Sequence, residues 1–245
     1  MTFIKAVRKP FPLKMCLVGV AGAGKTTTSL MIATEFAEGE QFAVIDTERS
    51  ASKYADQFSF DVCELDTFSP QKYVEAIHEA ESAGYKVAVI DGLSQAWNGP
   101  GGMLEIVDAI AKRGNGNSFQ AWSNATPILN SMVKAILDSP MHIICTMRSK
   151  TEYIVEQNEK GKSSPRRVGM APVQKDNLEF EFDIYGEMDQ DHTAIFHKSM
   201  CQALNRKVVD MKVNSKKVAA VLKKWTAGAP SRTEVHGQVE DARAE

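Results

Sequence analysis

The sequence has few of the features that mark secreted or membrane-spanning proteins. Only four of its 245 residues are cysteines, and none of them are spaced as C-x-x-C. Such sparse cysteines argue against a disulfide framework and indicate a reducing compartment. Residues 1–14 contain no apolar core of the signal-peptide type, and no apolar run approaches membrane-spanning length. We therefore expect a cytoplasmic protein with no membrane partner.

A large charge of one sign is also missing. The chain has 29 Lys and Arg residues against 31 Asp and Glu residues, a formal net charge of −2. A nucleic-acid site must therefore be a local basic patch and not a property of the whole surface. With 43% hydrophobic and 24% charged residues, the composition is that of an ordinary globular protein. The length is sufficient for one α/β domain.

A phosphate-binding loop follows the first apolar run. Residues 14–19 have the pattern of a short buried strand, Gly19–Thr26 matches G-x-x-x-x-G-K-[ST] in full, and a helix is expected from Lys25 to about Ala37. A P-loop requires this order of strand, glycine-rich turn and helix. The glycines let backbone N–H groups point at phosphates, and the helix start adds a favourable dipole. The expected nucleotide contacts are Gly19, Val20, Ala21, Gly22, Ala23, Gly24, Lys25, Thr26 and Thr27.

Two side chains of this loop have defined expected roles. Lys25 would reach the β- and γ-phosphates, and the Thr26 hydroxyl would hold Mg²⁺. ATP and Mg²⁺ are the predicted ligands. The alternative is a glycine-rich turn that matches by chance, which the flanking strand and helix patterns disfavour.

Two later strands are expected to deliver carboxylates to the same edge of the sheet. An apolar run at 41–46 leads to Glu48, which could orient the attacking water or be a solvated loop carboxylate. The run at 85–91 ends in Asp91, a Walker B pattern whose carboxylate would serve the Mg²⁺ shell. The alternative for Asp91 is a helix N-cap.

A locally basic segment follows a fourth buried strand at 141–146. Residues 148–175 contain seven basic and three acidic side chains, a balance of +4, and 159–165 is expected to be a hairpin tip or a disordered loop. A basic loop beside a nucleotide site suits single-stranded DNA, although a solvated hairpin without a ligand is the simpler alternative. The candidate DNA-binding residues are Arg148, Lys150, Tyr153, Lys160, Lys162, Arg166 and Arg167.

The remaining segments complete a single-domain plan. We expect an extended lead-in at 1–13, an ATPase domain at 14–226 and a disordered tail at 227–245. Within the domain, further patterns predict a strand at 61–65, a helix at 70–83, a mobile excursion at 98–118 around a helix at 103–112, and a long helix at 119–137. The last elements are expected to be an antiparallel hairpin of strands at 178–182 and 193–197, and a helix at 212–225.

Three stretches together resemble the RecA-like ATPase core: Gly19–Thr26, Phe42–Glu48 and Ala88–Asp91. The resemblance implies an α/β fold with a mainly parallel central sheet flanked by helices. It favours Glu48 as the residue that activates water, and it places Thr146 at the polar sensor position, where RecA has Gln. It also puts 98–118 and 150–175 at the positions of the two DNA-binding loops.

More closely, the chain is similar to small phage-encoded RecA-like ATPases, some of which are single-strand annealing recombinases. Thr146–Tyr153 and Ala171–Asn177 carry this likeness. It implies single-stranded DNA as a partner, a single-stranded-DNA-binding protein as a further candidate partner, and head-to-tail homo-oligomers. In such assemblies a cation reaches the neighbour's γ-phosphate; Lys198 is the first candidate for it and Arg206 the second.

Two other functions fit the same residues. One is a P-loop kinase of a small substrate, with Arg148, Arg166 and Arg167 as lid arginines. The other is a nucleotide-dependent interaction module, such as a loader of a replication protein, which would hydrolyse ATP slowly and act by changing shape.

Overall fold

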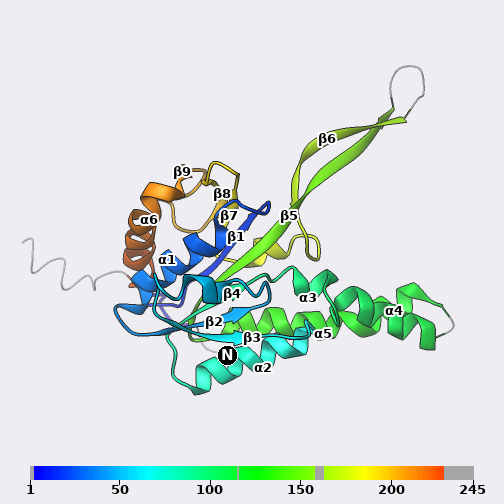
Figure 1. Cartoon of the computed structure of the whole chain (residues 1–245), viewed down its shortest axis with the longest axis horizontal. Helices are drawn as coiled ribbons and strands as arrows, with labels where there is room; N and C mark the ends of the chain where they lie inside the picture. The colour runs from blue at the N-terminus through cyan, green and yellow to red at the C-terminus, as the bar shows by residue number, and fades with distance from the viewer. Residues whose placement is uncertain (1–2, 115, 158–162, 229–245) are drawn as a thin grey trace, which may run out of the picture.

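A nine-stranded sheet forms the centre of the molecule in the computed structural model, which describes residues 3–114, 116–157 and 163–228 (Figure 1). Its path is β3-β2-β4-β5-β1-β7-β8-β9, with β6 paired to β5. Strands β3 to β7 in this path run parallel, while β8 and β9 are antiparallel additions. The bounds are β1 (Lys14–Gly19), β2 (Phe42–Asp46), β3 (Phe60–Glu64), β4 (Val87–Asp91), β5 (His142–Gln157), β6 (Ser163–Pro172), β7 (Ile184–Met188), β8 (Thr193–Ser199) and β9 (Val208–Asp210).

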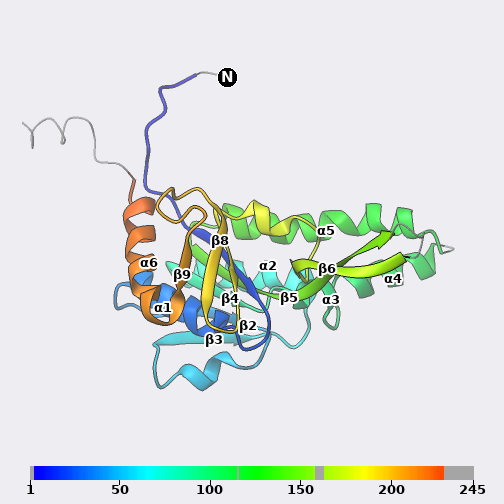
Figure 2. The ribbon, with the colours of Figure 1, turned by 90° about the horizontal axis from the view of Figure 1, so that it is seen from above.

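Helices cover both faces of this sheet, which gives the two-sided burial expected of parallel strands (Figure 2). One face packs against α1 (Lys25–Ala37) and α6 (Met211–Thr226). The other packs against α2 (Pro70–Ser82), α4 (Met103–Arg113) and α5 (Ser118–Asp138), while α3 (Gln95–Asn98) is a single turn after β4. The predicted α/β class with a mostly parallel sheet is therefore confirmed. In the described part of the chain, no helix has both the length and the hydropathy needed to cross a bilayer.

The helix predicted within the excursion at 98–118 is confirmed as α4, although the excursion is more closely packed than expected. Helix α4 packs against α5, and its side chains Met103 and Val107 are buried in the core. Gly101, with φ 77°, lies in the turn between α3 and α4, and Gly116, with φ 80°, lies between α4 and α5. These glycines, which predicted flexibility, also suit tight turns because such φ values favour glycine.

The expected strand at 178–182 is also wrong. Leu178–Glu181 is a 3₁₀ turn, and the strand β7 begins only at Ile184. Leu178 and Phe182 are buried while Phe180 is half exposed, so the three apolar residues do not share a face as they would in a strand. An apolar–polar alternation over only five residues cannot distinguish a strand from a 3₁₀ turn. Strands β7 and β8 pair antiparallel, with a register shift between Tyr185 and Gly186.

The largest departure from expectation is the length of β5. Instead of ending near Thr146, the strand continues to Gln157 and pairs antiparallel with β6, and the two form an arm that extends from the body of the molecule (Figure 1). No Pro or Gly interrupts 142–157, and the outer half contains strand-favouring residues such as Tyr153 and Val155. Of the segment at 159–165, predicted to be a hairpin tip or a disordered loop, residues 159–162 lie outside the described residues, and β6 begins at Ser163. Lys160 and Lys162 lie outside the described residues, as does most of the expected tail.

Candidate nucleotide-binding site

The P-loop lies at the carboxyl end of β1, between β5 and β7. Gly19 has Arg148 of β5 on one side and Met188 of β7 on the other, and a side chain at Gly19 would overlap the Met188 carbonyl. Gly22 and Gly24 have φ of 82° and 81°, a region that favours glycine. These three backbone requirements explain why the turn between β1 and α1 is built from glycines.

Helix α1 begins at Lys25 with its first N–H groups open. Gly24 occupies the N-cap and provides no side-chain cap, and the hydrogen bonds of the described chain use none of the N–H groups of residues 24–27 as donors. An uncapped helix start leaves unsatisfied donors and a positive dipole end. The loop therefore presents an array of donors suited to phosphate oxygens, and the residues present fit a nucleotide polyphosphate.

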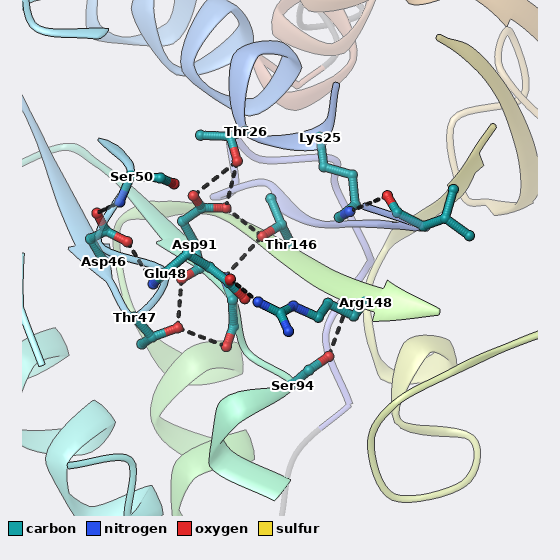
Figure 3. Close-up of polar contacts among 12 residues, drawn as sticks. Lys25, Thr26, Asp46, Thr47, Glu48, Ser50, Asp91, Ser94, Thr146 and Arg148 are labelled. Carbon is teal, nitrogen blue, oxygen red and sulfur yellow. Dashed lines mark hydrogen bonds and ion pairs between the residues drawn. The ribbon is translucent and has the colours of Figure 1, made fainter. Parts of the chain in front are cut away.

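Lys25 turns back over the loop. Its ammonium donates to the Gly19 and Val20 carbonyls at 2.9 and 2.8 Å (Figure 3). Burial lowers the pKa of Lys25, whereas the negative charges of Asp91 and Glu48 raise it and the positive charge of Arg148 lowers it further. All three charged partners therefore lie close enough to Lys25 for their fields to act on it.

Asp91 and Thr26 meet at the end of β4. The Thr26 hydroxyl donates to the Asp91 carboxylate, with Oγ1 2.9 Å from Oδ2, and Asp91 itself is almost fully buried. Burial raises the pKa of the Asp91 carboxyl, and hydrogen bonds from Thr146 and Thr26 oppose that rise. Two oxygen donors this close form the kind of hard ligand set that Mg²⁺ prefers, so the site fits this metal.

Thr146 has a different environment from the one expected of a phosphate sensor. Its hydroxyl donates to Asp91 Oδ1 at 2.6 Å and accepts from the Gly92 N–H at 2.9 Å, and the residue is buried. Both hydrogen-bonding functions of the hydroxyl are occupied within the chain. Thr146 thus holds the Asp91 carboxylate in place.

Glu48 lies at the same edge of the sheet as Asp91, and its side chain forms an ion pair with Arg148. Its carboxylate accepts a charge-assisted hydrogen bond from the Arg148 guanidinium, and the Glu48 side chain is 20% exposed against 54% for Arg148 (Figure 3). Arg148 was predicted as a DNA-binding residue and, in the kinase alternative, as a lid arginine. The structure places its guanidinium on Glu48 and its backbone beside Gly19.

Several residues of the site were not singled out from the sequence. Asp46 is fully buried, and its carboxylate accepts from the backbone N–H groups of Glu48, Ser50 and Ala51, each at 2.8 Å, which fixes the turn that carries Glu48. Thr47 Oγ1 lies 2.8 Å from the Asp91 carbonyl and ties this turn to β4. The available signal was the position of Asp46 at the end of a buried strand, since a buried carboxylate must be satisfied by donors.

The turn between β7 and β8 also reaches the loop. The ring of His192 lies against Gly24, so a side chain at position 24 would overlap with the ring. The sequence predicted a hairpin whose second strand is at 193–197, with no indication that tertiary packing would place its turn on the P-loop.

Lys198, predicted to act on the γ-phosphate of a neighbouring copy, lies away from the P-loop of its own chain. Because β8 is antiparallel, its end lies at the opposite edge of the sheet: Lys198 pairs with Tyr185, which is level with Cys16 and about 10 Å before Gly19. Its ammonium donates to the Phe180 and Phe182 carbonyls, the latter at 2.7 Å. The runner-up, Arg206, follows β8 and lies at that same edge, with its N–H bonded to the Phe196 carbonyl.

A family model described as an AAA domain matches residues 12–220, most of the chain. The chain belongs to this AAA domain family. Membership supports a nucleotide-binding protein of the P-loop ATPase type, in agreement with the geometry of Gly19–Thr26 and Asp91. No curated protein matches the sequence.

Proposed function

We propose that this AAA domain is a RecA-like ATPase of the phage recombination or strand-annealing type, acting in the cytoplasm of a bacterial host. It would bind ATP and Mg²⁺ at the P-loop, hydrolyse ATP with Glu48 as the water-activating base, and bind single-stranded DNA on the β5–β6 arm. The single observation that carries the proposal is that the root of the arm contacts both catalytic carboxylates, Asp91 through Thr146 and Glu48 through Arg148.

Each residue of the site has a role in this reaction. The open N–H groups and Lys25 bind the phosphates, and Thr26 with Asp91 would hold Mg²⁺, which when bound supplies charge neutralisation at the phosphates. Glu48 accepts a proton from the attacking water. Charge that develops on the γ-phosphate is neutralised within the subunit by Lys25, and Lys198 of a neighbouring copy stays the first candidate for a further cation.

The arm is connected to the site at both of its strands. On β5, the Arg148 N–H donates to the buried Ser94 hydroxyl at 2.9 Å, and the Thr146 carbonyl accepts from Leu93. After β6, the Val173 N–H donates to the Arg148 carbonyl at 2.7 Å, and the buried Gln174 amide donates to the Leu93 carbonyl at 3.0 Å. A change in the angle of the arm would therefore move the turn that follows Asp91.

The charge of the arm supports a polyanionic partner. With Arg148 assigned to the nucleotide site, the segment keeps Lys150, Lys160, Lys162, Arg166, Arg167 and Lys175 against three acidic residues. Lys150 is exposed at the root of the arm, and Tyr153 pairs in register with Arg167 across the two strands. Aromatic and basic residues on a projecting hairpin suit a single strand, on which bases stack and phosphates pair with cations.

Hydrolysis assays with and without single-stranded DNA, at low and moderate salt, test the proposal. We expect DNA to stimulate the parent, and added salt to weaken the stimulation because phosphate contacts release counterions. Glu48→Gln should lower the rate by about 10²-fold or more while nucleotide binding persists. Glu64→Gln, at the end of the neighbouring strand β3, is the matched control and should behave as the parent.

The arm is tested by the double charge reversal Arg166→Glu with Arg167→Glu. This variant should keep the DNA-free rate and lose the stimulation, whereas Lys207→Glu with Lys217→Glu, two exposed lysines elsewhere, should keep both. An arm variant that binds and responds to single strands as the parent does would contradict the DNA assignment.

A nucleotide-dependent loader remains the second candidate, favoured by the engagement of Glu48 with Arg148, which suits slow hydrolysis. It predicts tight nucleotide binding, no response to DNA, and a protein partner. A small-molecule kinase has less support, because Arg166 pairs with Ile154, about 20 Å along β5 from Arg148 and too far to cover the P-loop.

A further inference from the structure

An open groove of about 1170 Å³ lies beside the end of α6. It is bounded by this helix, by the segment that precedes β1 and by the turn that follows β8. Figure 2 shows the segment before β1 rising from the end of α6. The volume is above the range of about 300–1,000 Å³ that is usual for small-molecule sites. A groove of this size is therefore suited to a stretch of polypeptide.

The walls of the groove are held in place by the fold. Phe11 packs edge-on against Trp225 with ring centroids 4.7 Å apart, and its N–H donates to the Thr226 carbonyl at 3.1 Å. On the other wall, the Met200 N–H donates to the Asp183 carbonyl at 3.0 Å. Because both walls are fixed, a ligand that enters the groove does not have to order the chain first.

Much of the lining is aliphatic. Met200, a large apolar side chain, is 62% exposed, and Val221 and Ala203 line the same groove. Covering such side chains with another apolar group is favourable, and the flexible methionine side chain adapts to the shape that covers it. The lining therefore indicates a ligand with at least one large apolar side chain.

The charged side chains of the lining are basic. Arg8 and Lys224 belong to it, no acidic residue does, and neither cation is in an ion pair within the described chain. The Arg8 guanidinium donates to the Trp225 carbonyl at 2.6 Å, which positions it and leaves its other N–H groups for a ligand. Helix α6 itself, Met211–Thr226, contains five lysines and no acidic residue. A ligand with carboxylates would complement this charge.

The aromatic content of the groove favours a polypeptide over a nucleic acid. Single strands bind by stacking their bases on exposed aromatic rings. The aromatic residue of this lining, Trp225, is half-buried and already packed against Phe11. The aliphatic side chains beside it match the apolar side chains of a peptide and offer nothing to phosphates.

The groove lies at the far end of α6 from the nucleotide site. The Met211 N–H donates to the His192 carbonyl at 2.9 Å, and the His192 ring lies against Gly24, so α6 begins beside the P-loop. The 16 residues of the helix place its end about 24 Å further along. A ligand in the groove would therefore leave the P-loop open.

We propose that this groove binds an acidic segment of a partner protein, an extended stretch in which carboxylates flank at least one large apolar side chain. The apolar side chain packs on Met200 and Val221, and the carboxylates pair with Arg8 and Lys224. Charge-assisted hydrogen bonds of this kind are the stronger class in proteins. The proposal concerns a surface remote from the P-loop and does not depend on hydrolysis or on DNA binding.

Fluorescence anisotropy with labelled synthetic peptides tests the site on the full chain. The main probe is a short peptide in which leucines and phenylalanines alternate with aspartates. One control peptide has asparagine in place of each aspartate, and the other has serine in place of each apolar residue. We expect the parent to bind the main probe about tenfold more tightly than either control peptide, and added salt to weaken that binding.

Two independent variants change the groove. The charge reversal Arg8→Glu with Lys224→Glu, and separately Met200→Asp, should each weaken binding of the main probe about tenfold or more. Met200→Asp leaves the Arg8 contact with α6 intact, so it separates the groove from the anchoring of the segment before β1. Nucleotide binding should persist in both variants, because the P-loop lies at the other end of α6, and its persistence shows that they are folded.

Matched controls separate the groove from general surface effects. Lys53→Glu with Arg113→Glu reverses two exposed charges elsewhere, and Val213→Asp changes an exposed apolar residue of α6 that does not line the groove. Both should bind the main probe as the parent does.

Four results would overturn the proposal. The first two are a parent that binds none of the peptides and groove variants that bind the main probe as the parent does. The third is a preference for oligothymidylate, which would identify a nucleic-acid surface. The fourth is tighter binding of a synthetic 229–245 peptide than of the main probe, which would identify the chain's own tail as the occupant.

Discussion

Arg148 donates to the carboxylate of Glu48, although 100 positions separate the two residues along the chain. β5 brings Arg148 beside the P-loop, and the turn that Asp46 fixes brings Glu48 to it. A guanidinium that is hydrogen-bonded to the carboxylate occupies an oxygen that the attacking water would need. In the proposed mechanism, the contact restrains hydrolysis until Arg148 moves.

Removal of Arg148 should release this restraint. We expect Arg148→Ala to raise the DNA-free hydrolysis rate by about fivefold, the scale of a partly exposed ion pair, and to reduce the further stimulation by DNA. Steady-state hydrolysis with and without single strands measures both effects. Arg148→Lys, which keeps the charge, should stay closer to the parent, and a slower Arg148→Ala would show that Arg148 serves the transition state more than it restrains Glu48.

Thr146 should act through Asp91. Thr146→Val keeps the shape but leaves the buried Asp91 oxygen and the Gly92 N–H without their shared hydroxyl, a loss of about 1–3 kcal/mol in the free energy of unfolding. The variant should also need more Mg²⁺ for half-maximal hydrolysis, because the Asp91 carboxylate is less well positioned. Urea unfolding and a Mg²⁺ titration measure these effects, and Thr146→Ser, which retains the hydroxyl, should restore both.

Lys198 should matter for stability and not for turnover. Lys198→Met removes the donor to the Phe180 and Phe182 carbonyls and should lower the free energy of unfolding by about 1 kcal/mol. Hydrolysis per folded molecule should be unchanged, because the Lys198 ammonium is already engaged by two carbonyls of its own chain. A rate loss in a variant that is still folded and assembled would instead support Lys198 as the cation that acts on a neighbour's γ-phosphate.

His142 should make the fold sensitive to mild acid. Burial lowers its pKa from 6.5 to about 4, and its Nδ1 accepts the Leu13 N–H at 2.9 Å, which requires the neutral ring. Between these pH values the unfolded chain binds a proton that the folded chain does not, so stability falls as the pH falls from 6.5 towards 4. After allowance for solvent screening, we expect a loss of up to about 2 kcal/mol.

The control for this pH effect is His142→Gln, which can still accept the Leu13 N–H but does not titrate. Chemical unfolding of both proteins across the window isolates the histidine from carboxyls such as Asp91 and Asp183, whose pKa values burial raises. Equal pH dependence in the two proteins would show that His142 is not the group responsible.

Local sequence patterns were sufficient to predict structural elements that depend only on residues close together in the chain. The β1–loop–α1 unit follows from its own glycines and apolar residues, and α1 begins at Lys25 and ends at Ala37 as the sequence predicts. The helix α2, with Pro70 at its first turn, and the strand β4, ending at Asp91, were equally clear. The short alternation at 178–182 predicted a strand where the structure has a 3₁₀ turn. The glycines at 98–118 predicted a flexible loop, but glycine is equally suited to tight turns between packed helices.

The sequence by itself determined a P-loop nucleotide site, an α/β class and the order of most elements, because backbone conformation and hydrophobic period are set by residues close together in the chain. Only the tertiary structure decided the rest: that Arg148 contacts Glu48, that Lys198 lies away from the P-loop of its own chain, and that β3 pairs with β2 alone among the described residues. These depend on which strands become neighbours and in which direction they run. Packing of the whole chain settles both, through residues too distant in sequence to form a local pattern.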